Sequence, residues 1–371
     1  MTLITQAPPQ FTPDDIGNHC LVTGGAGYLG RRIVRRLVEA GCTVRSLDVI
    51  AHDHADIPGA EVECVVGDLR NYKDIADACK DIDTVFHAAA IIKILEIARP
   101  SLRRFVYDVN VHGTRNVVRA AESAGVKALV QTSTFAVVMD RELDGKDETL
   151  PYATQSKDLY CLTKIEAEKA VLAGDKPGGL RTCSLRPGGL WGSDTNCMMI
   201  KSILDQLAKD NFKVLIGDGK ATMDNTHVEN LVDAELLAAK ALHHHPEAAG
   251  GQAYFIVDDE RYNALEWFRP LVEGLDMKFP SFRLPGSMMK GIARMMEVSH
   301  FMGGPEPVLT VRGIRNMTET SSFRIDKARK HLGYEPRYKL ANGIPELLPM
   351  ARAYLDQARN QGKTSTAQHA A

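Results

Sequence analysis

Short apolar runs alternate with longer amphipathic segments through the first half of the chain. The runs predict β-strands at 20–23, 43–48, 62–66, 84–87, 128–131 and 182–185, and the amphipathic segments predict helices at 29–40, 71–79, 109–123 and 159–173. Strands that alternate with helices along a chain form a parallel sheet with helices on both faces. The pattern therefore predicts an α/β fold built on a Rossmann-type, doubly wound parallel sheet.

The pattern changes after Pro187. Helices are predicted at 197–209 and 262–275, a strand at 213–216, and a methionine-rich amphipathic segment at 281–305. A helix at 228–242 and a strand at 253–257 return to the earlier pattern. We expect a Rossmann domain at 16–192 that the chain rejoins at about 224–258, a smaller C-terminal substrate-binding domain at 193–223 and 259–357, and a flexible tail at 358–371.

A glycine-rich turn joins the first predicted strand to the first predicted helix. Gly24, Gly27 and Gly30 are each three residues apart. Glycines allow a tight turn and let the backbone approach a pyrophosphate, which the helix N-terminus then binds through free N–H groups. Because a strand precedes this turn and a helix follows it, the motif predicts a dinucleotide site.

Asp48 ends the second predicted strand, about twenty residues after the glycine turn. A carboxylate there accepts hydrogen bonds from ribose hydroxyls and repels a 2′-phosphate, so it predicts NAD rather than NADP. Asp68 follows the third strand, where it binds adenine or caps a helix. The other predicted cofactor contacts lie in the turn or at strand ends and are Tyr28, Leu29, Leu69, Ala88, Ala89, Ala90, Thr132, Pro187, Gly189 and Leu190.

Tyr160 and Lys164 form a YxxxK motif on the helix after the fifth strand. Side chains four residues apart share one helix face. An ammonium beside the phenol, together with a positively charged nicotinamide, would lower the tyrosine pKa and let it exchange a proton with a substrate alcohol. Ser133 or Thr134 at the end of the fifth strand would supply a helping hydroxyl, and Asn110 either anchors a water or is an ordinary helix amide.

Composition and charge narrow the range of partners. A formal charge of −2 and the absence of a basic stripe argue against nucleic acid as a partner. The seven cysteines form no CxxC pair, which predicts reduced thiols and no metal site. We find no signal peptide and no apolar stretch long enough to span a membrane, so we expect a cytoplasmic protein.

These motifs together resemble the 3β-hydroxysteroid dehydrogenase/isomerase family, within the extended short-chain dehydrogenase/reductase superfamily. The resemblance covers about 20–337 and is carried by TGGAGYLG (23–30), GDL (67–69), FHAAA (86–90), VNVHGTRNVVRAA (109–121), YCLTK (160–164), RPGGLWG (186–192), HVENLVDA (227–234) and AYFIVDDE (253–260). It implies oxidation of a steroid or sterol 3β-hydroxyl to the ketone with NAD⁺. Tyr160 and Lys164 match the family's pair, and Thr134 stands where the family has serine.

The resemblance implies three further properties. Some family members also move a Δ5 double bond to Δ4, and Asp258 and Asp259 match the aspartates assigned to that step, although adjacent acids at a strand end are also common in turns and caps. A homodimer through the helices around 109–123 and 159–173 is a family expectation. The 287–302 segment, with Lys290 and Arg294, suggests peripheral membrane contact, while its methionines would line an apolar substrate site or fill an ordinary core.

Three other functions remain as alternatives. A sugar-nucleotide epimerase or reductase shares the fold, but it must neutralise a second pyrophosphate, and 187–225 contains no arginine. A sterol-4-carboxylate 3-dehydrogenase, which loses the carboxylate after oxidation, would need a cation near the steroid A-ring. A non-catalytic NAD-sensing scaffold would have no need for the intact pair Tyr160 and Lys164.

Overall fold

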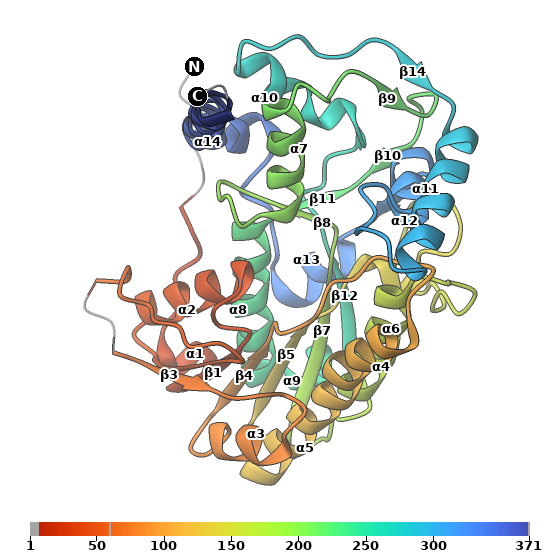
Figure 1. Ribbon diagram of the computed structural model, residues 1–371. Helices are drawn as coiled ribbons and strands as arrows, with labels where there is room; N and C mark the ends of the chain where they lie inside the picture. Colours follow the sequence, from red (N-terminus) through yellow and green to blue (C-terminus); the bar gives the residue numbers. More distant parts are fainter. Residues whose placement is uncertain (1–6, 59–60, 370–371) are drawn as a thin grey trace.

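The computed structural model describes residues 7–58 and 61–369, with side chains through residue 359. Within this part of the chain, seven parallel strands form the central sheet in the order β12-β7-β5-β4-β1-β2-β3 (Figure 1). They are β1 (His19–Thr23), β2 (Thr43–Asp48), β3 (Val62–Val66), β4 (Thr84–His87), β5 (Ala128–Thr132), β7 (Arg181–Pro187) and β12 (Gln252–Ile256). The predicted doubly wound α/β sheet is confirmed, including the return strand near 253–257.

Helices cover both faces of this sheet (Figure 1). In α2 (Tyr28–Glu39), Ile33, Val34 and Leu37 are buried against the sheet, because their spacing places them on one face of the helix. That face also carries α1 (Pro13–Ile16), α8 (Val228–His244), α9 (Pro246–Ala249) and α13 (Asp326–Leu332). The opposite face carries α3 (Tyr72–Ala78), α4 (Pro100–Tyr107), α5 (Thr114–Ala124) and α6 (Leu159–Leu172).

The helix predicted at 109–123 is longer and less regular than its sequence indicates. It begins at Pro100, whose fixed φ suits the first turn of a helix, and α4 runs directly into a π-helical segment, η1 (Asp108–Gly113), and then into α5. A π turn inserts one extra residue and rotates the side chains that follow, and such turns are frequent at functional sites. The apolar periodicity revealed the regular part of this helix but not the irregular one.

A second apolar core lies outside the sheet and joins the chain from 191–216 to that from 265–355. Its helices are α7 (Met198–Ala208), α10 (Arg269–Gly274), α11 (Gly286–Phe301), α12 (Val311–Thr318) and α14 (Leu340–His369). Its presence supports the predicted division into a Rossmann domain and a smaller C-terminal domain, whose boundaries we keep as a proposal.

Several short elements were not predicted from the sequence, with the exception of β9, which lies within the strand predicted at 213–216. Three small sheets have the orders β13-β10-β15-β6, β11-β8 and β14-β9. Their strands are β6 (Leu143–Lys146), β8 (Gly189–Trp191), β9 (Leu215–Ile216), β10 (Thr222–Met223), β11 (Asn225–His227), β13 (Tyr262–Asn263), β14 (Arg283–Leu284) and β15 (Ser321–Phe323). Two short 3₁₀ turns are η2 (Phe135–Val138) and η3 (Glu266–Phe268). Strands this short have no measurable alternation, so periodicity predicts only the longer elements.

The prediction of one helix over 262–275 is wrong in its first half. That half consists of β13 and η3, and α10 begins only at Arg269. The side chain of Asn263 accepts hydrogen bonds from the N–H groups of Leu265 and Glu266, each at 3.2 Å, and so turns the chain locally. A short polar side chain that binds its own downstream backbone competes with helix formation.

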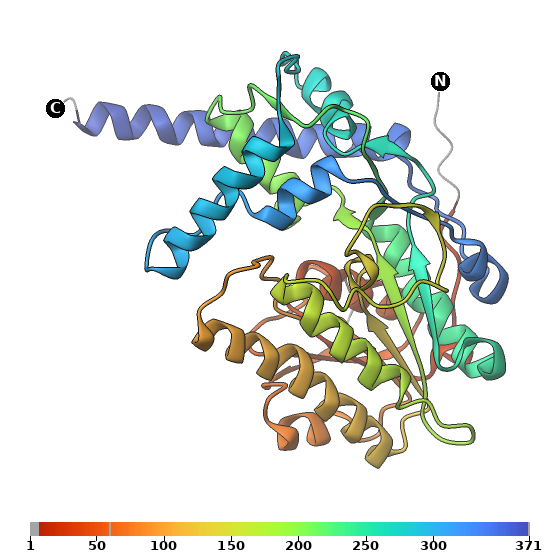
Figure 2. The same ribbon diagram turned by 90° about the vertical axis from the view of Figure 1, so that its right-hand side faces the viewer.

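Helix α14 was also missed, because Pro345 and Pro349 interrupt its sequence pattern. Figure 2 shows that its far half projects away from the rest of the molecule. The segment 358–371, predicted as a flexible tail, continues α14 as far as His369, and residues 370–371 lie outside the described part. Its flexibility stays a prediction.

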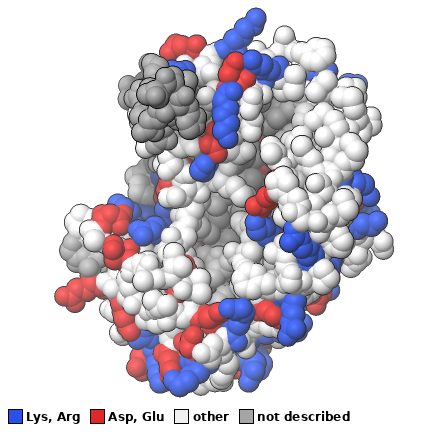
Figure 3. All heavy atoms as spheres, viewed as in Figure 1, with Lys and Arg blue, Asp and Glu red and all other residues white. Residues whose placement is uncertain are grey.

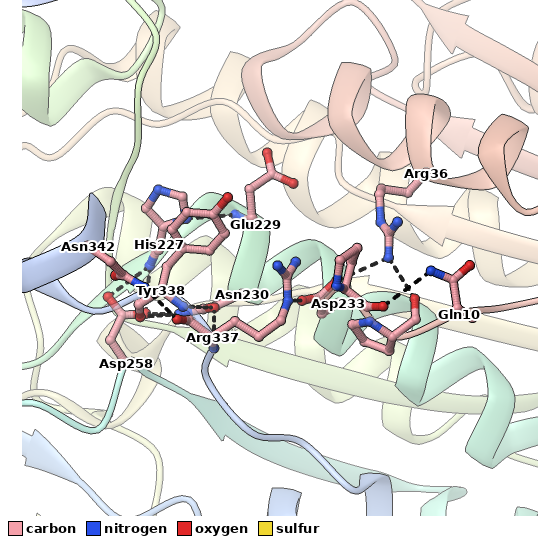
Figure 4. Close-up of polar contacts among 12 residues, drawn as sticks. Gln10, Arg36, His227, Glu229, Asn230, Asp233, Asp258, Arg337, Tyr338 and Asn342 are labelled. Carbon is pink, nitrogen blue, oxygen red and sulfur yellow. Dashed lines mark hydrogen bonds and ion pairs between the residues drawn. The ribbon is translucent and has the colours of Figure 1, made fainter. Parts of the chain in front are cut away.

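A buried carboxylate holds the two parts of the molecule together. The side chain of Asp258, 4% exposed, accepts hydrogen bonds from the backbone N–H of His227 (2.8 and 2.9 Å), from Asn230 Nδ2 (2.7 Å) and from Trp191 Nε1 (2.7 Å). Asn230 in turn bonds the backbone of Arg337 and Tyr338. Figure 4 shows the contacts of Asp258 with His227 and Asn230 beside the ion pairs that Asp233 makes with Arg36 and Arg337.

Replacing Asp258 with asparagine is therefore expected to destabilise the protein by about 2–4 kcal/mol, because an amide NH₂ would face donors that need an acceptor. Asp259→Asn is the matched control, since that carboxylate is 45% exposed in an ion pair with Arg329 and should matter by less than about 1 kcal/mol. Urea unfolding of both variants measures the difference. Equal stability of the two variants would contradict the anchoring role of Asp258.

Candidate active site

The glycine turn lies where the ends of β1 and β4 meet. Gly24 has φ of 75°, and a Cβ there would lie 2.8 Å from the Cα of Ala89. A Cβ on Gly30 would lie 2.0 Å from the carbonyl oxygen of Gly24. The turn thus packs directly against β4, and the first turn of α2, with Gly27 at its N-cap, carries no side-chain cap. Its backbone N–H groups suit an anionic ligand such as a pyrophosphate.

Asp48 stands beside this turn at the end of β2. One carboxylate oxygen accepts a hydrogen bond from the N–H of Ala26 at 3.1 Å and the other from the N–H of Val49 at 2.7 Å. These bonds fix the side chain next to the glycine turn, and it remains half-buried. An uncapped helix start, a backbone turn that admits no Cβ and an adjacent carboxylate fit the diphosphate and ribose of an NAD-type nucleotide.

Four other predicted contacts are occupied by the protein itself. The Tyr28 hydroxyl is buried beside Gly192, and Leu29 packs in the core. Asp68 forms hydrogen bonds with both the backbone and the guanidinium of Arg70, and Leu69 is buried. The contacts of these four residues with a nucleotide stay a prediction.

The small residues at the strand ends leave room beside the turn. Ala88, Ala89, Ala90, Gly189 and Leu190 are half-buried, while Pro187 is buried at the end of β7. Half-buried small side chains at these ends are consistent with close passage of a cofactor. Their contacts with a nucleotide stay a prediction.

Tyr160 lies in the first turn of α6, and the Thr134 hydroxyl is its hydrogen-bonding partner. Ser133 points elsewhere, because its hydroxyl donates a 2.5 Å hydrogen bond to Glu168 and is buried. Of the two hydroxyls that the sequence analysis left open, the geometry therefore favours Thr134 as the one that assists the phenol. The start of α6 itself is held by Asp158, whose side chain accepts hydrogen bonds from the N–H groups of Tyr160 and Cys161.

Lys164 extends from α6 to the end of β5. Its Nζ donates a hydrogen bond to the carbonyl oxygen of Thr132 at 2.6 Å, and the residue is 4% exposed. Burial lowers the pKa of Lys164 to about 8, opposed by the nearby carboxylates of Glu168 and Glu235. The ammonium is thus largely protonated at neutral pH even though it is buried.

The Tyr160 phenol is protonated in the protein without cofactor. Burial, together with the charge of Asp158, raises the pKa of Tyr160, and the bond with Thr134 offsets this only in part. That Lys164 and a bound nicotinamide lower this pKa stays a prediction.

Glu235 is a site residue that the sequence analysis missed. It lies on α8, is fully buried, and accepts a 2.6 Å hydrogen bond from the Thr132 hydroxyl. Burial raises the pKa of Glu235 to about 7, while Thr132 and Lys164 lower it. Thr132 therefore joins the two charged groups, through its carbonyl to Lys164 and through its hydroxyl to Glu235. Asp233 and Glu235 are the two acids among the apolar residues of 231–239, and this was the available signal.

A second buried ion pair, between Arg186 and Glu168, holds α6 in place. Arg186 at the end of β7 donates to Glu168 through Nη2 at 2.6 Å, and Glu168 is fully buried on α6. Glu168 also receives the bond from Ser133. Because Glu168 stands four residues after Lys164, this network fixes the face of α6 that carries the YxxxK pair.

Asn110, in the π-helical segment η1, is a buried amide that holds a loop. Its Oδ1 accepts from the N–H of Ile91 at 2.8 Å, and its Nδ2 donates to the carbonyl of Ile91 at 2.9 Å and to the Thr163 hydroxyl at 3.1 Å. It therefore ties the chain after β4 to α6, next to Lys164. Its predicted role as a water anchor stays a prediction.

The two aspartates considered for isomerisation are adjacent in sequence but have different surroundings. Burial raises the pKa of Asp258 to about 7, which would suit proton transfer, but its carboxylate is enclosed by the donors described above. Asp259 has φ of 54° and pairs with Arg329. These contacts favour the structural alternative for both residues, and an isomerase role stays a prediction.

A cavity of about 440 Å³ opens between the loop after β4 and the end of α11. Its lining includes Lys93, Leu95, Arg99, Leu102 and His300. Leu95 accepts a hydrogen bond from the N–H of Leu159, the residue before Tyr160, at 2.9 Å. The cavity wall is thus connected directly to the start of α6, and its size is typical of small-molecule sites.

Comparison with known sequences identifies the family of this chain. The family model described as "3-beta hydroxysteroid dehydrogenase/isomerase family" matches residues 21–286. The chain belongs to this family. A 3-beta-hydroxysteroid dehydrogenase of Mycolicibacterium neoaurum is 38% identical over 353 residues, which cover 94% of this chain and 95% of the relative.

A second relative carries both activities in its name. The 3 beta-hydroxysteroid dehydrogenase/Delta 5-->4-isomerase of Mycobacterium tuberculosis is 37% identical over 348 residues, 92% of this chain and 93% of the relative. Among solved structures, a short-chain dehydrogenase/reductase superfamily protein from Agrobacterium tumefaciens with bound NAD has a TM-score of 0.68 at 22% identity, covering 92% of this chain and 99% of that one. At that identity the likeness shows the fold.

The buried carboxylate of Glu235 is expected to affect the pKa of Lys164. Glu235→Gln removes a negative charge that favours the ammonium, so the pKa of Lys164 should fall below its value of about 8, by roughly one unit. NMR titration of protein with ¹³C-labelled lysine side chains measures it. Glu229→Gln, on the same helix but paired with Arg32, is the matched control and should leave Lys164 unchanged. An unmoved Lys164 titration in Glu235→Gln would show that the two charges are not coupled.

Proposed function

We propose that this protein is an NAD-dependent 3β-hydroxysteroid dehydrogenase, which oxidises the 3β-hydroxyl of a steroid or sterol to the 3-ketone. The observation that carries the proposal is the set of Tyr160, Thr134 and Lys164 at the edge of a dinucleotide site, in a member of this family. The names of the mycobacterial relatives support the substrate class. The nucleotide-bound fold relative supports NAD as the cofactor.

Each side chain has a defined task in this reaction. The glycine turn and Asp48 would hold NAD⁺, which would supply the acceptor for the hydride from C3 of the substrate. The Tyr160 phenol exchanges a proton with the substrate oxygen, and the hydroxyl of Thr134 holds both in line. Lys164 holds a positive charge near the end of β5, where it favours the anionic form of the phenol and binds ribose hydroxyls. The products are the ketone, NADH and one proton.

The protonation states of Tyr160 and Lys164 predict how the two directions of the reaction depend on pH. Because burial raises the pKa of Tyr160, the phenol is protonated in the resting protein and ready to donate in ketone reduction. Alcohol oxidation requires the reverse, so it should be favoured as the pH rises. Glu235 and Glu168 keep Lys164 charged over part of that range.

A sugar-nucleotide substrate would need a cationic side chain to bind its second pyrophosphate. Residues 187–225 contain no arginine, but Arg283 on β14 lies beside Gly217 and Asp218 in a cavity of about 530 Å³. Its guanidinium is already paired with Glu266 at 2.8 Å, so its charge is balanced within the protein. This pairing with Glu266 weighs against a second pyrophosphate at Arg283.

The decisive experiment follows absorbance at the NADH band with purified protein, NAD⁺ and a panel of 3β-hydroxysteroids, sterols, 4-carboxysterols and UDP-sugars. We expect turnover of a 3β-hydroxysteroid or sterol. Tyr160→Phe should lower kcat by about 100- to 10,000-fold, because it removes the proton-exchanging group. Thr134→Val should cost roughly tenfold and Thr134→Ser much less, whereas Ser133→Ala should act mainly on stability.

Other results from this substrate panel would favour one of the alternative functions. Turnover of a UDP-sugar with silence from every steroid would overturn the substrate assignment, and CO₂ release from a 4-carboxysterol would indicate the decarboxylating alternative. Full biological activity in Tyr160→Phe would support a non-catalytic NAD-sensing scaffold. Formation of a conjugated ketone tests isomerisation, and its selective loss in Asp258→Asn or Asp259→Asn would assign the step to that residue.

We also propose that the protein is a homodimer that touches a membrane surface through α11. Figure 3 shows few charged side chains over the upper right of this face, where α11 lies. There Met295, Phe301 and Met302 are 66%, 46% and 76% exposed, with Arg294 nearby. Within the described residues, no helix is long and apolar enough to cross a bilayer.

Sedimentation tests both parts of this proposal. The protein alone should sediment as a dimer, and it should co-sediment with anionic lipid vesicles. Met295→Glu should reduce vesicle binding severalfold without changing the dimer, because a charge on the exposed apolar face opposes insertion. A monomer, or vesicle binding that Met295→Glu leaves intact, would contradict the corresponding part.

A further inference from the structure

Two histidines and a cysteine meet at the outer edge of the central sheet. His52 and His54 belong to the loop after β2, and Cys64 lies in the middle of β3, opposite Ser46 in the strand register. One possible ligand atom from each of the three residues lies within 4.8 Å of the others. The strand pairing and the returning loop thus bring together residues that are ten and twelve positions apart in sequence.

The Ser46 hydroxyl lies between the two rings and determines their protonation. It is 2.8 Å from Nε2 of His52 and 2.9 Å from Nε2 of His54. His52 Nδ1 lies 3.0 Å from the carbonyl oxygen of Ile50 and so carries a proton, which leaves its Nε2 as an acceptor. The single hydroxyl proton of Ser46 goes to His52, and His54 Nε2 must then be the donor.

This assignment leaves His54 Nδ1 with a lone pair and no donor. His54 is 5% exposed, and its Nδ1 is buried without a hydrogen-bond partner among the described residues. Buried polar atoms in proteins are rarely left unpaired, so the ring retains an unused ligand atom.

We propose that His52, His54 and Cys64 form a binding site for a divalent metal ion of the zinc type. Two imidazoles and a thiolate are ligands that Zn²⁺ prefers. Zinc–ligand distances of about 2.0–2.3 Å place tetrahedral ligands about 3.3–3.8 Å apart, so the cluster needs to contract by roughly 1 Å. Cys64 is exposed, and water from that side completes the coordination.

This site lies apart from the proton-exchanging groups and would have a structural role. Lys164 binds the end of β5, whereas Cys64 stands on the edge strand β3. A bound ion would link the loop at 49–57 to β3, close to Asp48 and to Gly25, whose Cβ position is 1.9 Å from Ser46 Oγ. The proposal departs from the expectation of no metal, which rested on sequence spacing, and it does not depend on the proposed dehydrogenase activity.

The test is a titration of untagged, EDTA-treated full-length protein with Co²⁺ followed by competition with Zn²⁺. We expect one equivalent of Co²⁺ to bind with a thiolate-to-cobalt charge-transfer band, and Zn²⁺ to abolish that band. Zn²⁺ should also raise the unfolding temperature of the protein in a concentration-dependent manner.

Variants assign the ligands. Cys64→Ser should remove the charge-transfer band, and His52→Gln and His54→Gln should each weaken Co²⁺ binding at least about tenfold. His245→Gln is the matched control, because this histidine is exposed at the end of α8 and outside the cluster. Circular dichroism confirms that each variant is folded.

Two results would overturn the proposal. One is the absence of a charge-transfer band in the unmodified protein at saturating Co²⁺. The other is an unchanged stoichiometry and affinity in folded Cys64→Ser and His54→Gln, which would place the ion elsewhere on the surface.

Discussion

The carboxyl ends of parallel strands all lie along one edge of a sheet, and the candidate active site depends on that constraint. The glycine turn follows β1, Asp48 ends β2, the small residues follow β4, and Thr132 ends β5. Residues more than one hundred positions apart therefore meet without any long-range sequence signal. Ligand sites at this edge, near the point where strand order reverses between β1 and β4, are a general consequence of the doubly wound topology.

A connected set of buried charges positions the reactive pair within that frame. Burying an isolated charge is costly, so each is compensated by a partner: Lys164 by Thr132 and Glu235, and Arg186 by Glu168. These pairs join α6, α8 and the ends of β5 and β7. Because removing one partner leaves the other unpaired, the network constrains where Tyr160 lies as well as the charge of Lys164.

Buried carboxylates connect the outer apolar core to the central sheet and to the loop after β4. Asp258 connects the end of β12 to α8, β8 and the segment before α14, and Glu297 on α11 accepts from the backbone of Glu96, Ile97 and Val311. The latter contact fixes the loop that lines the cavity of about 440 Å³, where Leu95 accepts a hydrogen bond from the N–H of Leu159, the residue before Tyr160.

The sequence by itself determined the strands of the main sheet and the chemistry of the motif residues. Apolar periodicity revealed all seven strands of the main sheet, and the glycine spacing, Asp48 and YxxxK revealed a dinucleotide site with a proton-exchanging phenol, because these signals are local. Local sequence patterns do not show which side chains from distant parts of the sequence form hydrogen bonds with one another. Tertiary packing decided that Thr134 rather than Ser133 meets Tyr160, that Glu235 lies beside Lys164, that Asp258 is an anchor, and that His52, His54 and Cys64 come together.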